Sequence, residues 1–248
     1  ALFFLSKSRK FNYNNKITLI ESGDINSIGV GEGTTPMFKT FLESDCEIDE
    51  SEFLYKVGGS IKCGIKFDNW NFDEKYYYHN FVQGLDSETY KFCQHALNVD
   101  YEADIQRKIN GVSFDLLENN KTSKLFVKNY AYHFGANSLT SFFKEKCLEH
   151  TNFSYITNTI ETISYDDENC IEYLTLKDDN KVFGDIFINS LGFHGKDILK
   201  DQYRDIDYWD DKLINNSAFA IQVKNSQEEQ LEPYTTSTAQ DFGWTWKI

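Results

Sequence analysis

The sequence lacks the features that would direct the protein to nucleic acid or into a membrane. Its 25 basic residues are outnumbered by 39 acidic ones, the net charge is −14, and no basic block could displace counterions from a polyanion. No apolar run approaches the ~20 residues that a spanning helix needs, and the first residues contain no cleavable hydrophobic segment. We therefore predict no nucleic-acid partner and no membrane partner.

The CxxC pairs of many metal sites are absent as well. None of the five cysteines forms one. We predict no metal site, and we expect free thiols in a reducing, cytoplasmic setting.

The length of 248 residues and a hydrophobic content of 40% allow a sizeable core in one domain. The chain opens at Ala1 within a helix-like pattern and stops at Ile248 within a strand-like one. We therefore expect a fragment of a longer protein.

The N-terminal pattern is typical of the second half of a βαβ dinucleotide-binding unit. A helix is predicted over residues 1–10, an Asn-rich turn over 12–15 and a buried strand over 16–21, which ends in Glu21. A carboxylate at the end of such a strand can accept hydrogen bonds from the ribose hydroxyls of adenosine. The expected GxGxxG turn is absent, and most strands that end in Glu bind nothing.

Residues 28–36 form a glycine-rich turn that leads into a helix beginning near Met37. Three glycines let the backbone approach a flat ligand, while Thr34, Thr35 and Pro36 suit a helix start. A flavin ring, a phosphate or a halide would each suit this turn. The ordinary alternative is a plain loop followed by a capped helix.

Residues 58–70 are expected to form one half-buried strand, because apolar residues alternate with polar ones. On such a strand Lys62 and Lys66 lie on the same side. A solvated face explains this pattern as well as a site does.

Two aromatic stretches complete the candidate surface. Alternation places Tyr77, His79 and Phe81 on one strand face, and it places Trp244 and Trp246 on another. Aromatic strands usually belong to a core, which is the alternative here.

Between these motifs the patterns predict further helices over 47–57, 87–108 (two helices) and 136–150. They predict strands over 125–134, 153–157, 160–165, 171–176, 182–189, 217–223 and 243–248. The four strands between residues 153 and 189 follow one another as a meander.

Taken in order, these motifs resemble those of the flavin-dependent tryptophan halogenase family. The resemblance covers nearly the whole chain and rests on ITLIES (17–22), IGVGEGTTP (28–36), SIKCGIKFDNW (60–70), YYHNF (77–81), YAYHFGANSL (130–139), GDIFINSLGF (184–193) and GWTWKI (243–248). The tryptophan pair and the lysine motif are the most specific of these.

The resemblance implies an α/β (α+β) fold: an FAD-binding Rossmann-like domain of the aromatic hydroxylase/halogenase type with an inserted antiparallel sheet, truncated at both ends. It implies a single domain over 1–248, with flavin-binding parts at 1–70 and 125–200 and substrate-side parts at 71–124 and 201–248. A homodimer is one candidate assembly.

The implied activity is FADH2- and O2-dependent halogenation of an electron-rich aromatic such as tryptophan or another indole. A separate flavin reductase would supply the FADH2, and halide would be a co-substrate. Hypohalous acid would be guided to Lys62 as the catalytic residue, with Lys66 only carried by the strand. A flavin-dependent aromatic hydroxylase and a non-catalytic nucleotide-fold binding domain are the alternatives.

The resemblance also implies two groups of binding residues. His79, Phe81, Trp244 and Trp246 match substrate-side positions. Residues matching the cofactor side are Glu21, Gly29, Val30, Gly31, Glu32, Gly33, Thr34, Gly192 and Phe193.

Overall fold

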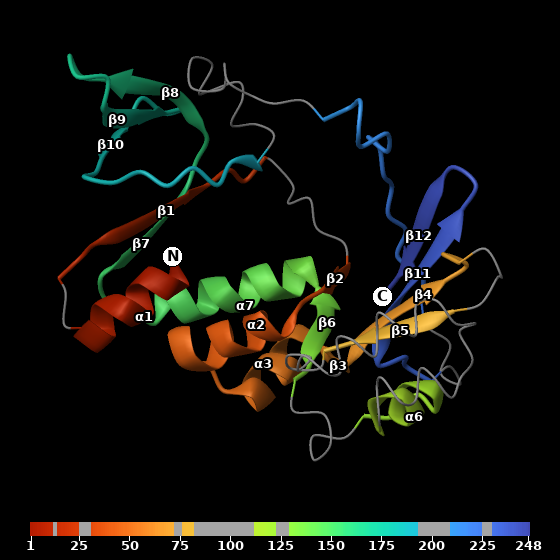
Figure 1. Ribbon diagram of the computed structural model, residues 1–248. Helices are drawn as coiled ribbons and strands as arrows, with labels where there is room; N and C mark the ends of the chain where they lie inside the picture. Colours follow the sequence, from red (N-terminus) through yellow and green to blue (C-terminus); the bar gives the residue numbers. More distant parts are fainter. Residues whose placement is uncertain are drawn as a thin grey trace. The chain divides into compact units, whose positions relative to one another are not determined.

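The computed structural model describes residues 1–11, 14–24, 31–71, 76–81, 112–122, 129–192, 209–224 and 230–248 (Figure 1). The chain divides into two compact units, one built mainly from residues 3–28 and 146–218 and the other mainly from 29–145 and 219–248. Among the described helices, none combines the length and apolar character needed to cross a membrane.

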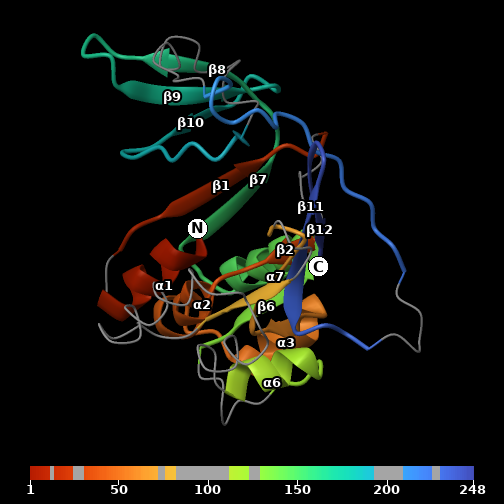
Figure 2. The same cartoon turned by 45° about the vertical axis from the view of Figure 1, so that its right-hand side comes forward.

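The first unit is built on a parallel pair of strands. Its leading elements are α1 (Leu2–Phe11), β1 (Ile17–Glu21) and β7 (Phe153–Thr157). β1 and β7 run side by side in register from Ile17↔Phe153 to Glu21↔Thr157 (Figures 1 and 2). The predictions of the first helix and strand are confirmed. The prediction that 153–157 belongs to the meander is wrong, because Asn152 bonds the chain before β1 and starts the parallel alignment.

An antiparallel meander follows in the same unit, made of β8 (Ile160–Tyr165), β9 (Ile171–Leu176) and β10 (Lys181–Phe183). The turn between β8 and β9 is closed by Asp166, whose carboxylate accepts hydrogen bonds from the backbone of Glu168 and Cys170. The predicted strand over 182–189 is wrong beyond Phe183. Ile186 and Ile188 alternate as in a strand, but they are exposed and no strand among the described residues pairs with them.

The second unit contains the antiparallel sheet β2–β6–β3, formed by Gly31–Gly33, Ala131–Gly135 and Ser60–Lys62. One face of β6 carries Tyr132 and Phe134 into an aromatic core with Phe53, at ring distances of 5.3 and 5.6 Å. The core also receives rings from α2 (Pro36–Thr40) and α7 (Ala136–Leu148). Aromatic pairs of this kind fix β6 firmly in place.

The helices around this core begin and end where local chemistry allows. The predicted helix over 47–57 begins later, as α3 (Glu50–Val57), because Glu47 has a left-handed backbone (φ 57°) and Asp49 is the N-cap. Gly58, also left-handed, ends it. Pro36 opens α2 as predicted, and α2 continues into a π-helical turn over Phe41–Asp45.

A second sheet of this unit has the order β12–β11–β4–β5, with bounds Gly243–Lys247, Tyr234–Gln240, Gly64–Asp68 and Tyr77–Asn80. α6 (Val112–Glu118) lies beside β5, where Glu118 accepts a hydrogen bond from the hydroxyl of Tyr76.

The prediction of one strand over residues 58–70 is wrong. The chain breaks at Cys63, whose N–H donates to Pro233 and whose carbonyl accepts from Phe81. The following Gly64 passes so close to His79 that an added Cβ would lie 2.7 Å from its carbonyl oxygen. β3 and β4 therefore belong to different sheets.

The strand over 243–248 and the helix over 136–150 are confirmed, with small changes at their ends. The strand predicted over 217–223 is wrong, because the segment is exposed and pairs with no strand in the described part of the chain; Phe219 is 89% exposed. Of the strand predicted over 125–134, residues 131–134 are confirmed as part of β6, while residues 125–128 lie outside the described residues, as do the two helices predicted over 87–108.

Candidate functional site

Lys62 lies at the end of β3 and is 2% exposed. Register pairs Ser60 with His133 and Lys62 with Ala131, so Lys62 and His133 share one face of the β2–β6–β3 sheet. The opposite face is the one that carries Tyr132 and Phe134 into the aromatic core. The lysine therefore lies on the side of the sheet that the core leaves open.

Gly33 of β2 makes room for the lysine. An added Cβ there would lie 3.0 Å from Lys62 Nζ, 3.0 Å from Thr235 Oγ1 and 3.4 Å from His133 Cδ2. Three side chains from three different strands thus converge on one glycine. His133 Nε2 and Thr235 Oγ1 are hydrogen-bonded at 2.9 Å, and Thr235 is fully buried.

Burial controls the charge of these groups. Desolvation by burial lowers the pKa of the Lys62 amine from 10.5 to about 8. Within the described part of the chain, Lys62 forms no ion pair, and its polar end faces the ring of Phe81 at 5.6 Å. Burial, and after it the Lys62 charge, lowers the pKa of His133 to about 4, so the imidazole is neutral at pH 7.

A pKa near 8 changes what the lysine can do. About one-tenth of the amine is neutral at pH 7, against roughly one part in three thousand for an ordinary lysine. The same side chain can therefore donate hydrogen bonds as an ammonium or act as a nucleophile as an amine.

Lys66 has a different place. It lies on β4, in the other sheet, and its ammonium faces the ring of Tyr76 at 4.2 Å. The prediction that both lysines occupy one side of one strand is therefore wrong. Lys66 is not part of the cluster at Gly33.

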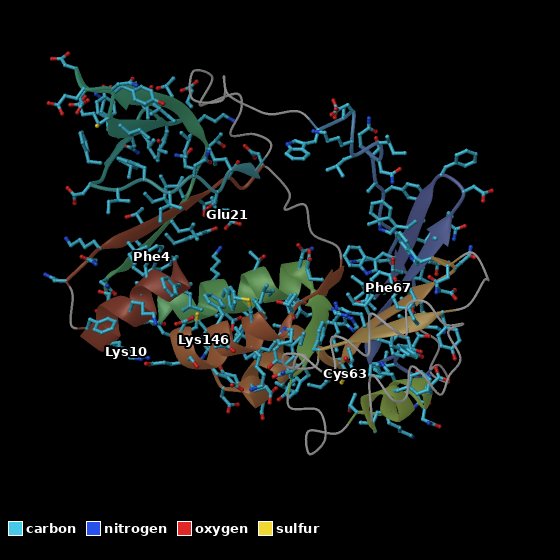
Figure 3. The ribbon with its side chains drawn as sticks, viewed as in Figure 1. Phe4, Lys10, Glu21, Cys63, Phe67 and Lys146 are labelled. Atoms are coloured by element: carbon cyan, nitrogen blue, oxygen red, sulfur yellow. The ribbon has the colours of Figure 1, made fainter. Side chains whose placement is uncertain are left out.

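An aromatic surface continues from this cluster across the four-stranded sheet. Register aligns Trp246, Ser237, Phe67 and Tyr77 in one row, and alternation adds Trp244 to the same face. Phe67 stacks on Tyr77 at 5.0 Å, and both tryptophans are about half exposed, at 50 and 59%. Figure 3 labels Phe67 and Cys63 in this region.

His79 lies on the same face, since it pairs with Ile65, which pairs with Thr235. Its side chain is exposed. The structure thus brings Gly33 and Phe81 to Lys62, and it places His79 and the tryptophans on the sheet face to which Thr235 belongs.

The residues predicted to bind the cofactor lie in several different elements, and some lie outside the described residues. Glu21, labelled in Figure 3, ends β1. The Tyr155 hydroxyl donates a hydrogen bond to its carboxylate. Gly31, Glu32 and Gly33 form a short strand where a loop was one alternative. Gly192 has a left-handed backbone with φ 57°. Gly29, Val30 and Phe193 lie outside the described residues.

The expectation that threonines cap α2 is wrong. Thr35 is the N-cap residue but makes no side-chain cap bond. The Thr34 hydroxyl instead accepts from the Tyr132 N–H at 3.0 Å, and this bond extends the pairing of β2 with β6.

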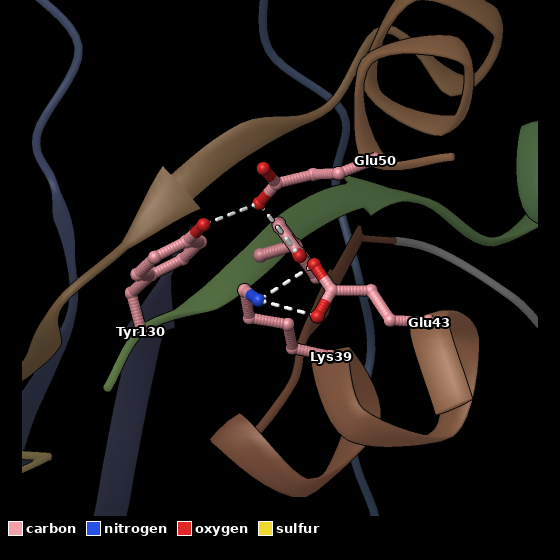
Figure 4. Close-up of polar contacts among 5 residues, drawn as sticks. Lys39, Glu43, Glu50 and Tyr130 are labelled. Atoms are coloured by element: carbon pink, nitrogen blue, oxygen red, sulfur yellow. Dashed lines mark hydrogen bonds and ion pairs between the residues drawn. The ribbon is translucent and has the colours of Figure 1, made fainter. Parts of the chain in front are cut away.

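A partly buried carboxylate, Glu50, supports β6 on the face opposite Lys62 (Figure 4). The hydroxyls of Tyr130 and Tyr132 donate to Glu50 Oε1 at 2.6 and 2.9 Å. Beside them Lys39 pairs with Glu43 at 2.6 Å and covers the Tyr130 ring. Burial and the Glu50 bond raise the pKa of both tyrosines, which keeps them as donors.

His133 and Thr235 were missed from the sequence. The available signal was the alternation of Ala131, His133 and Gly135, a strand face on which one histidine is the only large side chain. Thr235 gave no comparable signal, because it lies among other threonines and serines.

Comparison with known proteins identifies the family of this chain. The family model described as tryptophan halogenase matches residues 4–248. Tryptophan 7-halogenase RebH of Lentzea aerocolonigenes is 26% identical over 253 residues, and tryptophan 6-halogenase ThaL of Streptomyces albogriseolus is 27% identical over 255. Each alignment covers 94% of this chain and 48% of the relative. The chain spans about half the length of these curated relatives.

Solved structures confirm the expected fold class. A tryptophan halogenase from Shewanella frigidimarina superposes with a TM-score of 0.77 at 29% identity, covering 94% of this chain and 46% of its own. The tryptophan C-6 flavin-dependent halogenase Tar14 superposes with a TM-score of 0.86 at 24% identity, covering 100% and 52%, and it supports the fold alone.

Proposed function

Because this chain belongs to the tryptophan halogenase family, we propose that it is part of a flavin-dependent halogenase in which Lys62 delivers the halogen to an aromatic ring. The observation that carries the proposal is the Lys62 amine, which is buried against Gly33 and Phe81 without an ion pair from the described residues. A surface lysine with a solvated charge would have none of these features.

The resemblance assigns a flavin dinucleotide to residues in each unit. Glu21 ends a parallel strand, where its carboxylate suits ribose hydroxyls, and Gly192 has open space where a Cβ would be. At Gly31 an added Cβ would meet Ile248 at 3.7 Å. Gly29, Val30, Glu32, Thr34 and Phe193 complete this set by resemblance. Gly33 would contribute its backbone only, because Lys62 and Thr235 fill the space beside it. When bound and reduced, FAD supplies the electrons with which O2 and halide give hypohalous acid and water.

Lys62 would then act in one of two protonation states. As an ammonium it donates a hydrogen bond to the oxygen of hypohalous acid and makes the halogen more electrophilic. As a neutral amine it exchanges one N–H hydrogen for the halogen, with release of water, and passes the halogen to the ring carbon, which returns a proton. In both cases the buried position limits escape of the oxidant.

The substrate class follows from the aromatic surface. An electron-rich ring, such as tryptophan, another indole or a phenol, suits the face that carries Trp244, Trp246 and Tyr77, with His79 as an exposed polar partner. Phe81 would contact both the ring and the lysine end. We assign residues 1–70 and 125–200 to flavin binding and 71–124 and 201–248 to the substrate side, with FADH2 supplied by a separate reductase.

The test uses the complete protein with a flavin reductase, bromide or chloride, and a panel of indoles and phenols. We expect Lys62→Ala to lower halogenated product by at least about a hundredfold, since positioning of the reactive group is lost. Lys66→Ala is the matched control and should change turnover by no more than about twofold. Full turnover in Lys62→Ala would contradict the role of the lysine, and products that gain oxygen instead of halogen would indicate a hydroxylase.

A further inference from the structure

Two buried polar side chains beside Lys62 have no part in the proposed reaction. His133 and Thr235 come from β6 and β11, which belong to different sheets, and they meet through the 2.9 Å bond between Nε2 and Oγ1. Both lie within 3.4 Å of the point where a Gly33 Cβ would be, and Lys62 Nζ lies 3.0 Å from the same point. The imidazole, the hydroxyl and the amine therefore form one compact cluster.

The hydrogen-bonded pair of His133 and Thr235 joins two sheets, but joining the sheets does not require polar side chains. A tie between sheets could be made by apolar side chains at no desolvation cost, whereas burying a histidine and a threonine is favourable only when they are hydrogen-bonded to each other. The polar pair lies at the point where the two sheets meet the lysine. The position of this pair indicates that it acts on the lysine.

We propose that His133 is a positioning residue for Lys62, and that Thr235 fixes its imidazole in the orientation that packs against the lysine amine. The role rests on the proposed function of Lys62. The amine and the imidazole lie 3.0 and 3.4 Å from the point where a Gly33 Cβ would be, and the amine lies 5.6 Å from the centre of the Phe81 ring. A neutral imidazole can position the amine and still allow it to lose its proton. A carboxylate in the same position would stabilise the ammonium and so keep the lysine charged.

The charges around the lysine are consistent with this role. His133 is neutral at pH 7, and the neighbouring thiol of Cys63 is neutral because burial raises its pKa to about 11. Glu32, on β2 beside Gly33, is exposed and pairs in register with Phe134, which places it on the other face. Thr235 of β11 and Phe81 carry no charge. Among the described residues, His133 is thus a neighbour at which a substitution is expected to shift the protonation of Lys62.

The first experiment measures the lysine directly in the complete protein, without relying on halogenation. The pH dependence of Lys62 acetylation by an N-hydroxysuccinimide ester, followed by peptide mass spectrometry, gives the midpoint at which the amine loses its proton. We expect His133→Glu to raise this midpoint by at least one unit, so that the reactive fraction at pH 7 falls about tenfold, while the midpoint of Lys66 stays unchanged. If His133→Glu does not fold, Thr235→Asp brings the carboxylate from β11 instead.

The second experiment separates positioning from a purely structural tie. Thr235→Val keeps the volume but removes the hydroxyl, and we expect kcat for halogenation to fall about tenfold with an unchanged KM for the aromatic, with Thr235→Ser restoring the rate. A structural tie would instead lower the melting temperature in Thr235→Val and leave both kcat and the acetylation midpoints unchanged.

An unchanged Lys62 midpoint in the folded carboxylate variant would overturn the inference, as would an unchanged kcat in Thr235→Val. If the complete protein does not halogenate any aromatic, the acetylation midpoints still decide whether position 133 lies close enough to Lys62 to influence its charge. Failure of the proposed function and failure of the inference are therefore distinguishable.

Discussion

Replacing Lys62 by methionine should make the protein more stable at neutral pH. The amine is 2% exposed, and its pKa is about 8 in the folded state, against 10.5 as the ordinary value that applies to the unfolded chain. Below pH 8 the ammonium is present in both states, and its burial destabilises the folded one. Methionine has a similar length, carries no charge and fits apolar surroundings.

The size of the effect follows from the two pKa values. A difference of 2.5 units between 10.5 and about 8 corresponds to about 3 kcal/mol of unfolding free energy at pH 7. Because the unfolded chain binds more protons between pH 8 and 10.5, stability of the wild type should rise through that window. It should be constant below pH 8, where both states are protonated.

The assay is urea denaturation of the wild type and Lys62→Met at pH 7 and at pH 10. We expect the variant to be more stable at pH 7, and we expect the difference to shrink at pH 10. Lys66→Met is the control, since Lys66 lies in the other sheet over a tyrosine ring, and it should show no such pH dependence. A Lys62→Met protein that is less stable at both pH values would refute the account of a desolvated lysine.

Two further predictions concern the supporting contacts. Tyr155→Phe removes the hydroxyl that donates to the Glu21 carboxylate. We therefore expect the FAD affinity of the complete protein, measured by flavin fluorescence, to fall about fivefold. Unchanged affinity would mean that Tyr155 does not orient Glu21. Glu50→Gln leaves Tyr130 and Tyr132 with a weaker acceptor, and we expect a loss of about 1–3 kcal/mol in urea denaturation, whereas a loss below the experimental error would show that the network does not hold β6.

Much of the fold could be predicted where the signal is local. The strand over β1, the long helix α7 and the strands β8 and β9 each carry their period within a few residues, and all are confirmed. The resemblance to the halogenases rested on whole motifs in order, and the family match supports it.

The errors come from pairing partners that are distant in sequence. Residues 58–70 read as one strand, but β3 pairs with β6 near residue 131 and β4 with β11 near residue 234, so the chain must break between them. Residues 217–223 have the alternation of a strand and lack a partner strand in the described part of the chain. Periodicity indicates which residues can form a strand, and pairing decides which of them do.

Only part of the site could be predicted, because some of its residues are distant from one another in the sequence. Lys62 could be singled out because its motif is contiguous. His133 and Thr235 could not, because they lie 71 and 173 residues further along the chain and become neighbours only when two sheets meet at Gly33. Both residues have the pattern of ordinary core strands.

The most direct test of the central claim is whether Lys62 keeps the oxidised halogen within the site. The complete wild-type protein and Lys62→Ala would each turn over reduced flavin, O2 and bromide in the presence of an indole and an excess of a soluble scavenger of hypobromous acid. We predict that the wild type brominates the indole and leaves the scavenger largely unreacted, while Lys62→Ala brominates the scavenger and little indole. Equal partition between indole and scavenger in the two proteins would contradict the account.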